Sequence, residues 1–346
     1  MNVPELVAFA RFKGLNILGT GDALHPAWLK ELKRDLEPDP GGLYRPKTGQ
    51  DIYFIPQVEV ATIHQYEGKS RKIHHVILMP SLEVAEQLSE MLGRFGDVSS
   101  DGRPVLSMHP AELVEITMSL DSRNIIFPAH VWTPWWSIFG ARSGVDRIEE
   151  CYEDQVKHVH AIETGLSSDP PMNWRISWLD NYMLLSSSDA HSPYPYRIGR
   201  EAVVFELTNP CYSEIVDAIR TRDKRRIVMT LEVPPAYGKY HWSGHRECGV
   251  GPLSPLESKR LGNRCPVCHR KLTKGVEERV EELADRMPGH KPADAVEFKT
   301  VIPLQELIAI SVGMGPEAET KLMSKKVWSI YEKLNHHLGN EFTILL

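Results

Sequence analysis

The chain has no long apolar run: nowhere do about 18 consecutive apolar residues occur, the minimum for a helix that crosses a membrane. It opens without the positively charged and then apolar stretch of a secretory leader. It also has no Gly-x-Gly-x-x-Gly turn, which argues against binding of a dinucleotide. From these absences we expect a cytoplasmic protein without a membrane partner.

Positive charge and cysteine are both limited. Lys and Arg number 40 against 46 Asp and Glu, so the net charge of −6 argues against indiscriminate binding to nucleic acid but permits a local basic groove. Three of the five cysteines lie close together late in the chain, a pattern that suits a metal site in a reducing compartment better than a disulfide framework. The apolar share of 42% is ordinary for a globular protein.

At 346 residues, the chain is long enough for one large domain with additional parts. Up to about residue 235, short apolar runs alternate with amphipathic segments, which predicts parallel strands joined by helices, in a barrel rather than an open sheet. The predicted strands are 16–20, 52–60, 75–79, 125–129, 161–163, 183–186, 202–205 and 227–230, and the predicted helices include 4–13, 82–95, 110–121 and 212–221.

The remaining third of the chain divides into two parts. Residues 236–275 are rich in Gly, Pro, His and Cys and have little periodicity, so they cannot form a packed core unaided. Residues 276–346 are predicted to be helical, with helices at 276–285, 304–311 and 324–338. We therefore expect a catalytic barrel over 1–235, a zinc-binding segment over 236–275 and a helical domain over 276–346.

The most informative run is 184–193, in which an apolar strand leads into Asp189-Ala190-His191 and a proline follows. Residues two apart in a strand point to the same side, so the carboxylate and the imidazole would converge at the strand end. Both groups bind zinc or manganese, and barrel enzymes place their chemistry at such ends. The alternative is a turn cap beside a surface histidine.

Other predicted strands carry similar groups. Each alone is explained by a capped loop or a solvated charge, but burial of so many charged groups without pairing or coordination would be costly. Together they indicate a multinuclear zinc or manganese site. The groups are Asp22 and His25 after the first strand, Glu59 within the second, His74 and His75 at the start of the third, and His130 after the fourth.

These segments resemble the polymerase and histidinol phosphatase (PHP) superfamily and, within it, the endonuclease Q family. The resemblance covers almost the whole chain and rests on long, unusual strings. They are Gly19-Thr20-Gly21-Asp22-Ala23-Leu24-His25-Pro26, Pro128-Ala129-His130-Val131-Trp132-Thr133-Pro134-Trp135, Glu163-Thr164-Gly165-Leu166-Ser167-Ser168-Asp169-Pro170-Pro171-Met172-Asn173-Trp174, Ser188-Asp189-Ala190-His191-Ser192-Pro193, Gly238-Lys239-Tyr240-His241 and the late cysteine cluster.

The resemblance implies a distorted PHP-type (β/α)7 barrel with a metal centre. It also implies an endonuclease that cuts DNA on the 5′ side of uracil, hypoxanthine, xanthine or an abasic site after flipping the base. It assigns metal ligation to Glu59, His75, His130, Asp189 and His191, with Asp22 as a further ligand and His25 as its alternative. Among these, Glu59, Asp189 and His191 are the expected catalytic residues.

One feature of the superfamily is not found in this chain. PHP proteins carry a His-x-His pair on a first strand that would precede the helix predicted at 4–13. We therefore expect the barrel to be incomplete at its first strand and the centre to hold two or three divalent cations (Zn²⁺, Mn²⁺ or Mg²⁺). An inactive DNA-binding or scaffold form is one alternative to the nuclease, and a PHP-type phosphoesterase acting on small molecules is another.

The late cysteines predict a second metal site. His245 and Cys248 are followed by Cys265 and Cys268, two x₂-spaced pairs typical of a tetrahedral structural zinc. His241 and His269 are alternatives to His245, and a chance pair of buried thiols is the alternative to a metal site.

The expected partner is damaged DNA, with a replication or repair factor as a possible second partner. Basic residues around the zinc segment suit either a solvated surface or phosphate contacts, and the resemblance favours DNA. Aromatic residues near the expected metal site are candidates for stacking on a flipped base, although core or lid packing is the alternative. The candidate DNA-binding residues are Trp132, Trp135, Trp174, Arg175, Lys259, Arg260 and Arg264.

Overall fold

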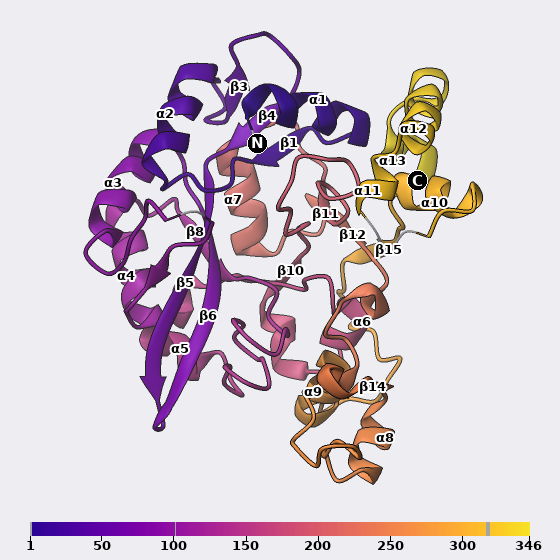
Figure 1. The fold of residues 1–346 in the computed structure, drawn as a ribbon. Helices are drawn as coiled ribbons and strands as arrows, with labels where there is room; N and C mark the ends of the chain where they lie inside the picture. The colour runs from indigo at the N-terminus through magenta and orange to yellow at the C-terminus, as the bar shows by residue number, and fades with distance from the viewer. Residues whose placement is uncertain (1, 101, 316–318) are drawn as a thin grey trace.

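The computed structural model describes residues 2–100, 102–315 and 319–346 and has a mixed α/β architecture (Figure 1). Its first part closely follows the predicted strands and helices. The elements are α1 (Val3–Lys13), β1 (Ile17–Gly19), α2 (Pro26–Asp35), β2 (Leu36–Pro38), β3 (Tyr44–Pro46), β4 (Tyr53–Ile55), β5 (Gln57–Tyr66), β6 (Lys69–Leu78), α3 (Leu82–Leu92), β7 (Val105–Leu106), α4 (Pro110–Leu120) and β8 (Ile125–Pro128).

The middle of the chain continues the alternation with shorter elements, and the last part is mostly helical. The middle elements are α5 (Glu149–Tyr152), β9 (Ala161–Glu163), α6 (Pro170–Asn173), β10 (Met183–Leu185), β11 (Ala202–Phe205), α7 (Tyr212–Thr221) and β12 (Ile227–Glu232). The last are β13 (Ser243–His245), β14 (Val250–Leu253), α8 (Pro255–Arg260), α9 (Val276–Leu283), β15 (Glu297–Thr300), α10 (Leu304–Ser311), α11 (Glu319–Leu322), α12 (Lys325–Leu338) and α13 (Glu341–Leu345).

Local sequence signals set the helix boundaries. The Asn2 side chain accepts a hydrogen bond from the Glu5 N–H at the start of α1, and Gly14, with φ of 97°, ends the helix. Ser81 caps α3 in the same way by accepting from the Val84 N–H. These caps explain why both helices begin within a residue of the predicted positions.

The prediction of uniformly parallel strands was wrong for the longest pair. β1–β4, β9–β10, β5–β7 and β12–β15 are parallel, but β5–β6, β6–β8 and β11–β12 are antiparallel. The cause at β5–β6 is the two-residue turn Glu67-Gly68, whose φ angles of 49° and 70° are those of a tight hairpin turn. The strands of the described residues form five separate sheets, and no closed barrel is found among them.

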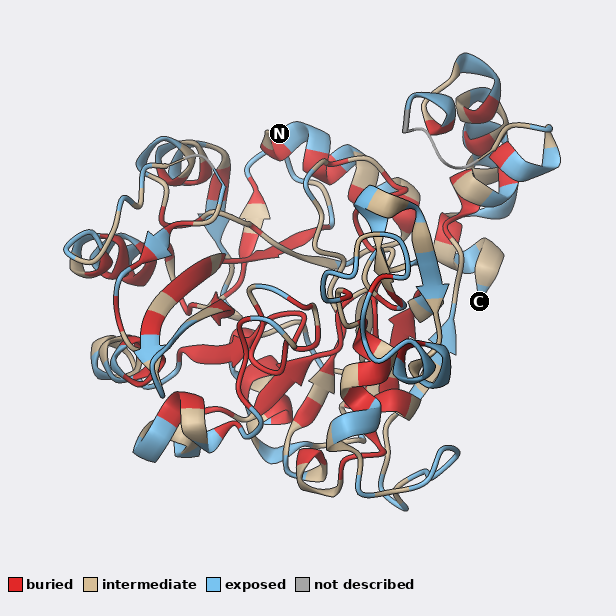
Figure 2. Cartoon of the chain, turned by 60° about the horizontal axis from the view of Figure 1, so that its bottom comes forward, coloured by how far each residue is buried: buried red, intermediate tan, exposed pale blue. Residues whose placement is uncertain are grey.

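Two apolar clusters fill the large N-terminal part. One packs α1–α4 against the β5–β6 hairpin, and the other packs α7 against β8, β9 and β10. Figure 2 shows these buried strands in the interior, with the C-terminal helices projecting from the rest of the molecule. A third, smaller cluster lies among α10, α11 and α12. No described helix combines the length and apolar character needed to cross a membrane.

A buried ion pair joins the first helix to the last. Lys13 Nζ lies 2.6 Å from Glu341 Oε1, with both side chains 1% exposed. Lys13 also donates to the Pro195 carbonyl at 2.9 Å, while Tyr331 donates to Glu341 Oε2 at 2.8 Å. Each charge is therefore fully partnered, as burial requires.

We predict that Lys13→Ala lowers the free energy of unfolding by about 3–5 kcal/mol, because it leaves the Glu341 carboxylate buried without a cation. Lys33→Ala is the matched control: its pair with Glu86 is 2.7 Å long but 36% and 52% exposed. An exposed pair should contribute no more than about 1 kcal/mol. Urea unfolding of both variants measures the difference, and equal losses would contradict the assignment.

Candidate metal centre

The β5–β6 hairpin positions the first two groups of the centre. Residues directly opposite in the antiparallel register point to the same face, and His74 lies opposite Ala61, two residues from Glu59 on β5. Glu59 and His74 therefore share one face of the hairpin. His130 follows β8, which pairs with the other edge of β6 and brings the imidazole to the same place.

Glu59, His74 and His130 form a compact group. Glu59 Oε1 lies 3.0 Å from His74 Nδ1 and 3.3 Å from His130 Nε2, and the two imidazole nitrogens are 2.9 Å apart. The two histidine side chains are 10% exposed and that of Glu59 is 17% exposed. One carboxylate and two imidazoles converging at this spacing can hold a metal ion.

Arg103 connects this group to the Asp189-x-His191 motif. Its Nε lies 2.7 Å from Glu59 Oε1, and its Nη2 lies 2.6 Å from Asp189 Oδ1. His191 Nε2 is 3.5 Å from the same Asp189 oxygen, and the His191 side chain is 71% exposed. The predicted ligands from β5, β8 and the end of β10 therefore meet in one network, which opens to solvent at His191.

Both carboxylates of the network are held in the charged form. Burial raises the pKa of Glu59, but the hydrogen bonds of His130 and His74 outweigh it and bring this pKa well below its usual value. Burial also raises the pKa of Asp189, yet the hydrogen bond of His191, with the charges of His130 and Arg103, lowers it to about 2. The ionised carboxylates of Glu59 and Asp189, joined through Arg103, therefore make this site suitable for binding a cation.

Strained backbone marks three of the predicted site residues. Asp22, His130 and Asp189 have φ angles of 41°, 30° and 43°, a region that non-glycine residues seldom adopt. At His130 the conformation is fixed by Glu163, whose Oε2 accepts from the His130 N–H at 2.7 Å. Such strain concentrates at functional sites because the surrounding structure must enforce it.

His75, the predicted ligand, is not part of this group, and His74 takes its place. Since His75 lies opposite Val60, its ring points to the other face of the hairpin. There both ring nitrogens are engaged, Nε2 at 2.8 Å from Thr62 Oγ1 and Nδ1 at 2.8 Å from Tyr152 OH. Burial lowers the pKa of His75 to about 3, so it is a neutral core residue.

Asp22 and His25 lie at the end of β1, outside the Glu59–His74–His130 group. The segment is anchored beside the start of β5, because the Gly21 N–H donates to Gln57 Oε1 at 3.0 Å. His25 is the residue that precedes α2, and its N–H donates to the Asp22 carbonyl at 2.8 Å. Their ligand roles stay predictions.

A second group lies in the late segment, where His245, Cys248, Cys265 and Cys268 converge. Cys268 Sγ is 3.9 Å from both ring nitrogens of His245. Ideal tetrahedral zinc bonds would place such a pair roughly 3.6 Å apart. Hydrogen bonds from Arg270 lower the pKa of Cys268 to about 6, which favours the thiolate that zinc needs.

The alternative fourth ligands do not join this second group. His241 Nδ1 instead lies 3.0 Å from the Ser167 carbonyl, and the set of four ligand atoms does not include His269. The donor set of three sulfurs and one nitrogen fits a closed structural zinc site.

The predicted DNA-binding residues differ widely in exposure. Trp132 is 1% exposed and donates to Asn173 Oδ1, and Arg175 is 7% exposed and paired with Glu281 at 2.5 Å, so their DNA-binding roles stay predictions that this structure does not support. Burial within the core leaves these two side chains no surface for DNA. Trp174 is 8% exposed, whereas Trp135 is 40% exposed, and Lys259, Arg260 and Arg264 are all on the surface.

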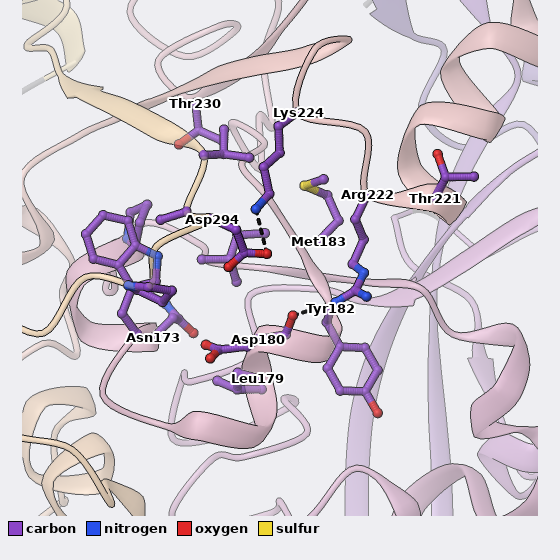
Figure 3. Close-up of a pocket in the computed structure, with 16 residues that line it drawn as sticks. Asn173, Leu179, Asp180, Tyr182, Met183, Thr221, Arg222, Lys224, Thr230 and Asp294 are labelled. Atoms are coloured by element: carbon purple, nitrogen blue, oxygen red, sulfur yellow. Dashed lines mark hydrogen bonds and ion pairs between the residues drawn. The ribbon is translucent and has the colours of Figure 1, made fainter.

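Trp174 lines a separate cavity of about 310 Å³ (Figure 3). Met183, at the start of β10, also lines it, whereas Asp189 follows the other end of that strand. Its cations are already partnered: Lys224 Nζ lies 2.6 Å from Asp294 Oδ2, and Arg222 donates to the Asp180 carbonyl. The cavity is therefore not part of the metal centre.

Sequence reasoning did not assign two members of the network: it chose His75 over the neighbouring His74, and it missed Arg103. The choice between His74 and His75 depends on strand register, which two adjacent histidines do not reveal. Arg103 lies in a loop before β7, 44 residues after Glu59 and 86 before Asp189, and no motif marks it. Only the tertiary structure brings its guanidinium between the two carboxylates.

We predict that Arg103→Ala increases the affinity of the centre for Mn²⁺ by tenfold or more, because the guanidinium competes with a cation for both carboxylates. Isothermal titration calorimetry measures the change, with Arg123→Ala as control, since Arg123 pairs with Asp121 at the surface. Unchanged or weaker Mn²⁺ binding would contradict the competition.

For the second group, we predict that Cys265→Ser releases zinc and lowers the melting temperature, because a segment poor in apolar residues loses its cross-link. Cys211→Ser is the control, since Cys211 lies outside the group. Native mass spectrometry counts the zinc, and a full zinc content in Cys265→Ser would refute the assignment.

No protein-family model matches the chain. Two relatives found by sequence are themselves uncharacterized. YqxK of Bacillus subtilis is 28% identical over 346 residues, with 97% of this chain and 82% of YqxK covered. MJ0043 of Methanocaldococcus jannaschii is 32% identical over 220 residues, which cover 62% of this chain. This chain spans only 26% of the length of MJ0043.

Solved structures give a fuller match. The lesion-specific endonuclease PfuEndoQ from Pyrococcus furiosus is 32% identical, with a TM-score of 0.84, and the match covers 99% of this chain and 80% of PfuEndoQ. A complex of Endonuclease Q with a 27-mer duplex substrate, with an abasic lesion at the active site, gives 32% identity, a TM-score of 0.85 and coverage of 99% and 81%. At this identity and coverage, the chain belongs to the endonuclease Q family.

Proposed function

We propose that the chain is a metal-dependent endonuclease that hydrolyses a phosphodiester bond of damaged DNA. The observation that carries this proposal is the continuous network from His74, His130 and Glu59 through Arg103 to Asp189, in a chain that matches PfuEndoQ over 99% of its length. The neighbouring complex with an abasic-lesion duplex supports damaged DNA as the substrate.

Glu59, His74 and His130 would hold a divalent cation, and Asp189 and His191 would contribute to the same centre. Cations bound there would lower the pKa of a coordinated water to about 7 and neutralise charge on the phosphate. We infer two or three such cations, of Zn²⁺, Mn²⁺ or Mg²⁺, together with one structural zinc at Cys248, Cys265, Cys268 and His245.

The protein side chains would supply charge and positioning. Asp189 has a pKa of about 2, so its carboxylate is charged at neutral pH and suits cation binding, whereas it would be a weak base toward the attacking water. His191 is the most exposed member of the network, so it is the group that incoming DNA would meet first. Glu59 lies deeper and would fix the two imidazoles.

We infer that the substrate lesions are deaminated bases (uracil, hypoxanthine and xanthine) as well as abasic sites, with cleavage on the 5′ side. Removal of a base from the stack costs a few kcal/mol, and this cost is least for a damaged or missing base. Base flipping into a site near the network would therefore contribute to selectivity.

The finer architecture is also a proposal: a PHP-type barrel over 1–235, the zinc segment over 236–275 and a helical domain over 276–346. The separate apolar cluster of α10–α12 supports the third unit. However, β15 pairs with β12, so residues 297–300 add a strand to the sheet of the first unit.

The test is a nicking assay on labelled duplexes that carry an abasic site, uracil, hypoxanthine or xanthine, with an undamaged duplex beside them. We expect Mn²⁺-dependent nicking of lesion duplexes and a loss of about 10²–10⁴-fold in Asp189→Asn. Asp154→Asn, a surface carboxylate outside the network, serves as the matched control.

Three results would count against the proposal. They are absence of nicking on every lesion duplex, equal nicking of undamaged DNA, and hydrolysis of nucleotide or sugar phosphates alone. The last would identify a small-molecule phosphoesterase instead.

A further inference from the structure

An exposed aromatic and basic surface lies directly beside the metal centre. Trp135 is 40% exposed, and its ring packs edge-on against Tyr240, with centroids 5.4 Å apart. Lys239 Nζ and Arg246 Cζ lie 5.5 Å and 4.8 Å from the centroid of the Tyr240 ring. We refer to Trp135, Lys239, Tyr240 and Arg246 as the Tyr240 platform.

Hydrogen bonds and a ring contact connect the platform to the metal centre. Thr133 Oγ1 lies 3.1 Å from His130 Nδ1 and donates to the Trp135 carbonyl at 3.0 Å. The next residue, Trp136, stacks on the ring of His74 with centroids 5.2 Å apart. One short loop therefore carries both a group of the centre and an edge of the platform.

The Tyr240 side of the platform is held by backbone contacts. The Tyr240 carbonyl accepts from the Val276 N–H at 2.9 Å, at the start of α9. Nearby, Gly238 approaches Ser167 so closely that a Cβ atom would lie 2.2 Å from Ser167 Oγ. The platform is thus presented rigidly between the Ser167 loop and the zinc segment.

The charge of the platform is available to a ligand. Within residues 2–100, 102–315 and 319–346, neither Lys239 nor Arg246 forms an ion pair with a carboxylate. By contrast, the nearby Arg270 is paired with Glu247 at 2.6 Å. Arg246 Nη2 donates to the Lys239 carbonyl, a neutral partner that leaves its charge in place. Two cations without a carboxylate partner beside a partly exposed tyrosine ring match a nucleotide, whose phosphate binds cations and whose base stacks on aromatic rings.

We propose that the Tyr240 platform binds an unpaired base of the lesion-bearing duplex by stacking, while Lys239 and Arg246 contact the flanking phosphates. This inference rests on the proposed function, because it takes damaged DNA as the ligand. A base that has lost its partner leaves the stack at a lower cost than a paired base, and once it is out of the stack it exposes a π-face. The platform would therefore favour damaged over intact DNA.

The experiment uses the full chain in an Asp189→Asn background, so that DNA is bound without being cut. The probe is a duplex with 2-aminopurine opposite an abasic site, because its orphaned base is the only unpaired one. We expect binding to quench the 2-aminopurine fluorescence, and Tyr240→Ala to abolish this quenching. Affinity for the abasic duplex should fall by about 5- to 150-fold, with less than about twofold change for the intact duplex.

Two further variants separate stacking from a general loss of structure. Tyr240→Phe keeps the ring and should behave as the parent does. Tyr66→Ala removes a matched tyrosine at the tip of the β5–β6 hairpin, where Arg71 lies 5.8 Å from the ring, and should also bind normally. Lys239→Gln/Arg246→Gln should weaken intact and abasic duplexes alike and reduce the salt slope by about two.

The outcomes distinguish the two proposals. If wild-type chain nicks lesion duplexes but Tyr240→Ala binds and quenches like Tyr66→Ala, the platform assignment is wrong and the nuclease stands. If the wild type neither binds nor nicks lesion DNA, both fall together.

Discussion

The register of the β5–β6 hairpin is the constraint on which the candidate centre depends. The Glu67-Gly68 turn fixes the pairing, because both residues adopt positive φ angles. That pairing sends Glu59 and His74 to one face and His75 to the other. A shift of one residue would exchange the two histidines and bury the carboxylate against the core. The chemistry of the site is therefore decided several residues away, at a solvent-exposed turn.

Beside this hairpin lie two carboxylates, those of Glu59 and Asp189, and the cationic or hydrogen-bonding groups that stabilise their charge. Glu59 and Asp189 are kept ionised by imidazoles and by Arg103, a cation that bridges them directly. The surrounding structure maintains the strained backbone at His130 and Asp189, at His130 through the hydrogen bond from its N–H to Glu163. The Arg103 guanidinium therefore occupies a position between the two carboxylates that a metal cation would also favour.

One stretch of chain, residues 238–246, carries both part of the Tyr240 platform and His245 of the second candidate metal group. Residues 238–246 pass from the Ser167 loop to His245, so a metal bound at His245 would hold the segment that carries Tyr240 and Arg246. Neither the cavity at Trp174 nor the buried Lys13–Glu341 pair takes part; the pair instead fixes the C-terminal helices to α1.

Sequence alone determined where most helices and strands lie, because caps and apolar periodicity act locally, as at Ser81 and in β9. It also determined that Glu59, His130, Asp189 and the two x₂-spaced pairs of the late segment, one His/Cys and one Cys/Cys, were the groups to follow, since their residue types and spacing express metal chemistry directly. Only the tertiary structure decided that β5 and β6 run antiparallel, that His74 replaces His75, that Arg103 joins two distant carboxylates and that Trp132 and Arg175 are buried. These depend on strand register and on contacts between segments far apart in the chain, which no local pattern encodes.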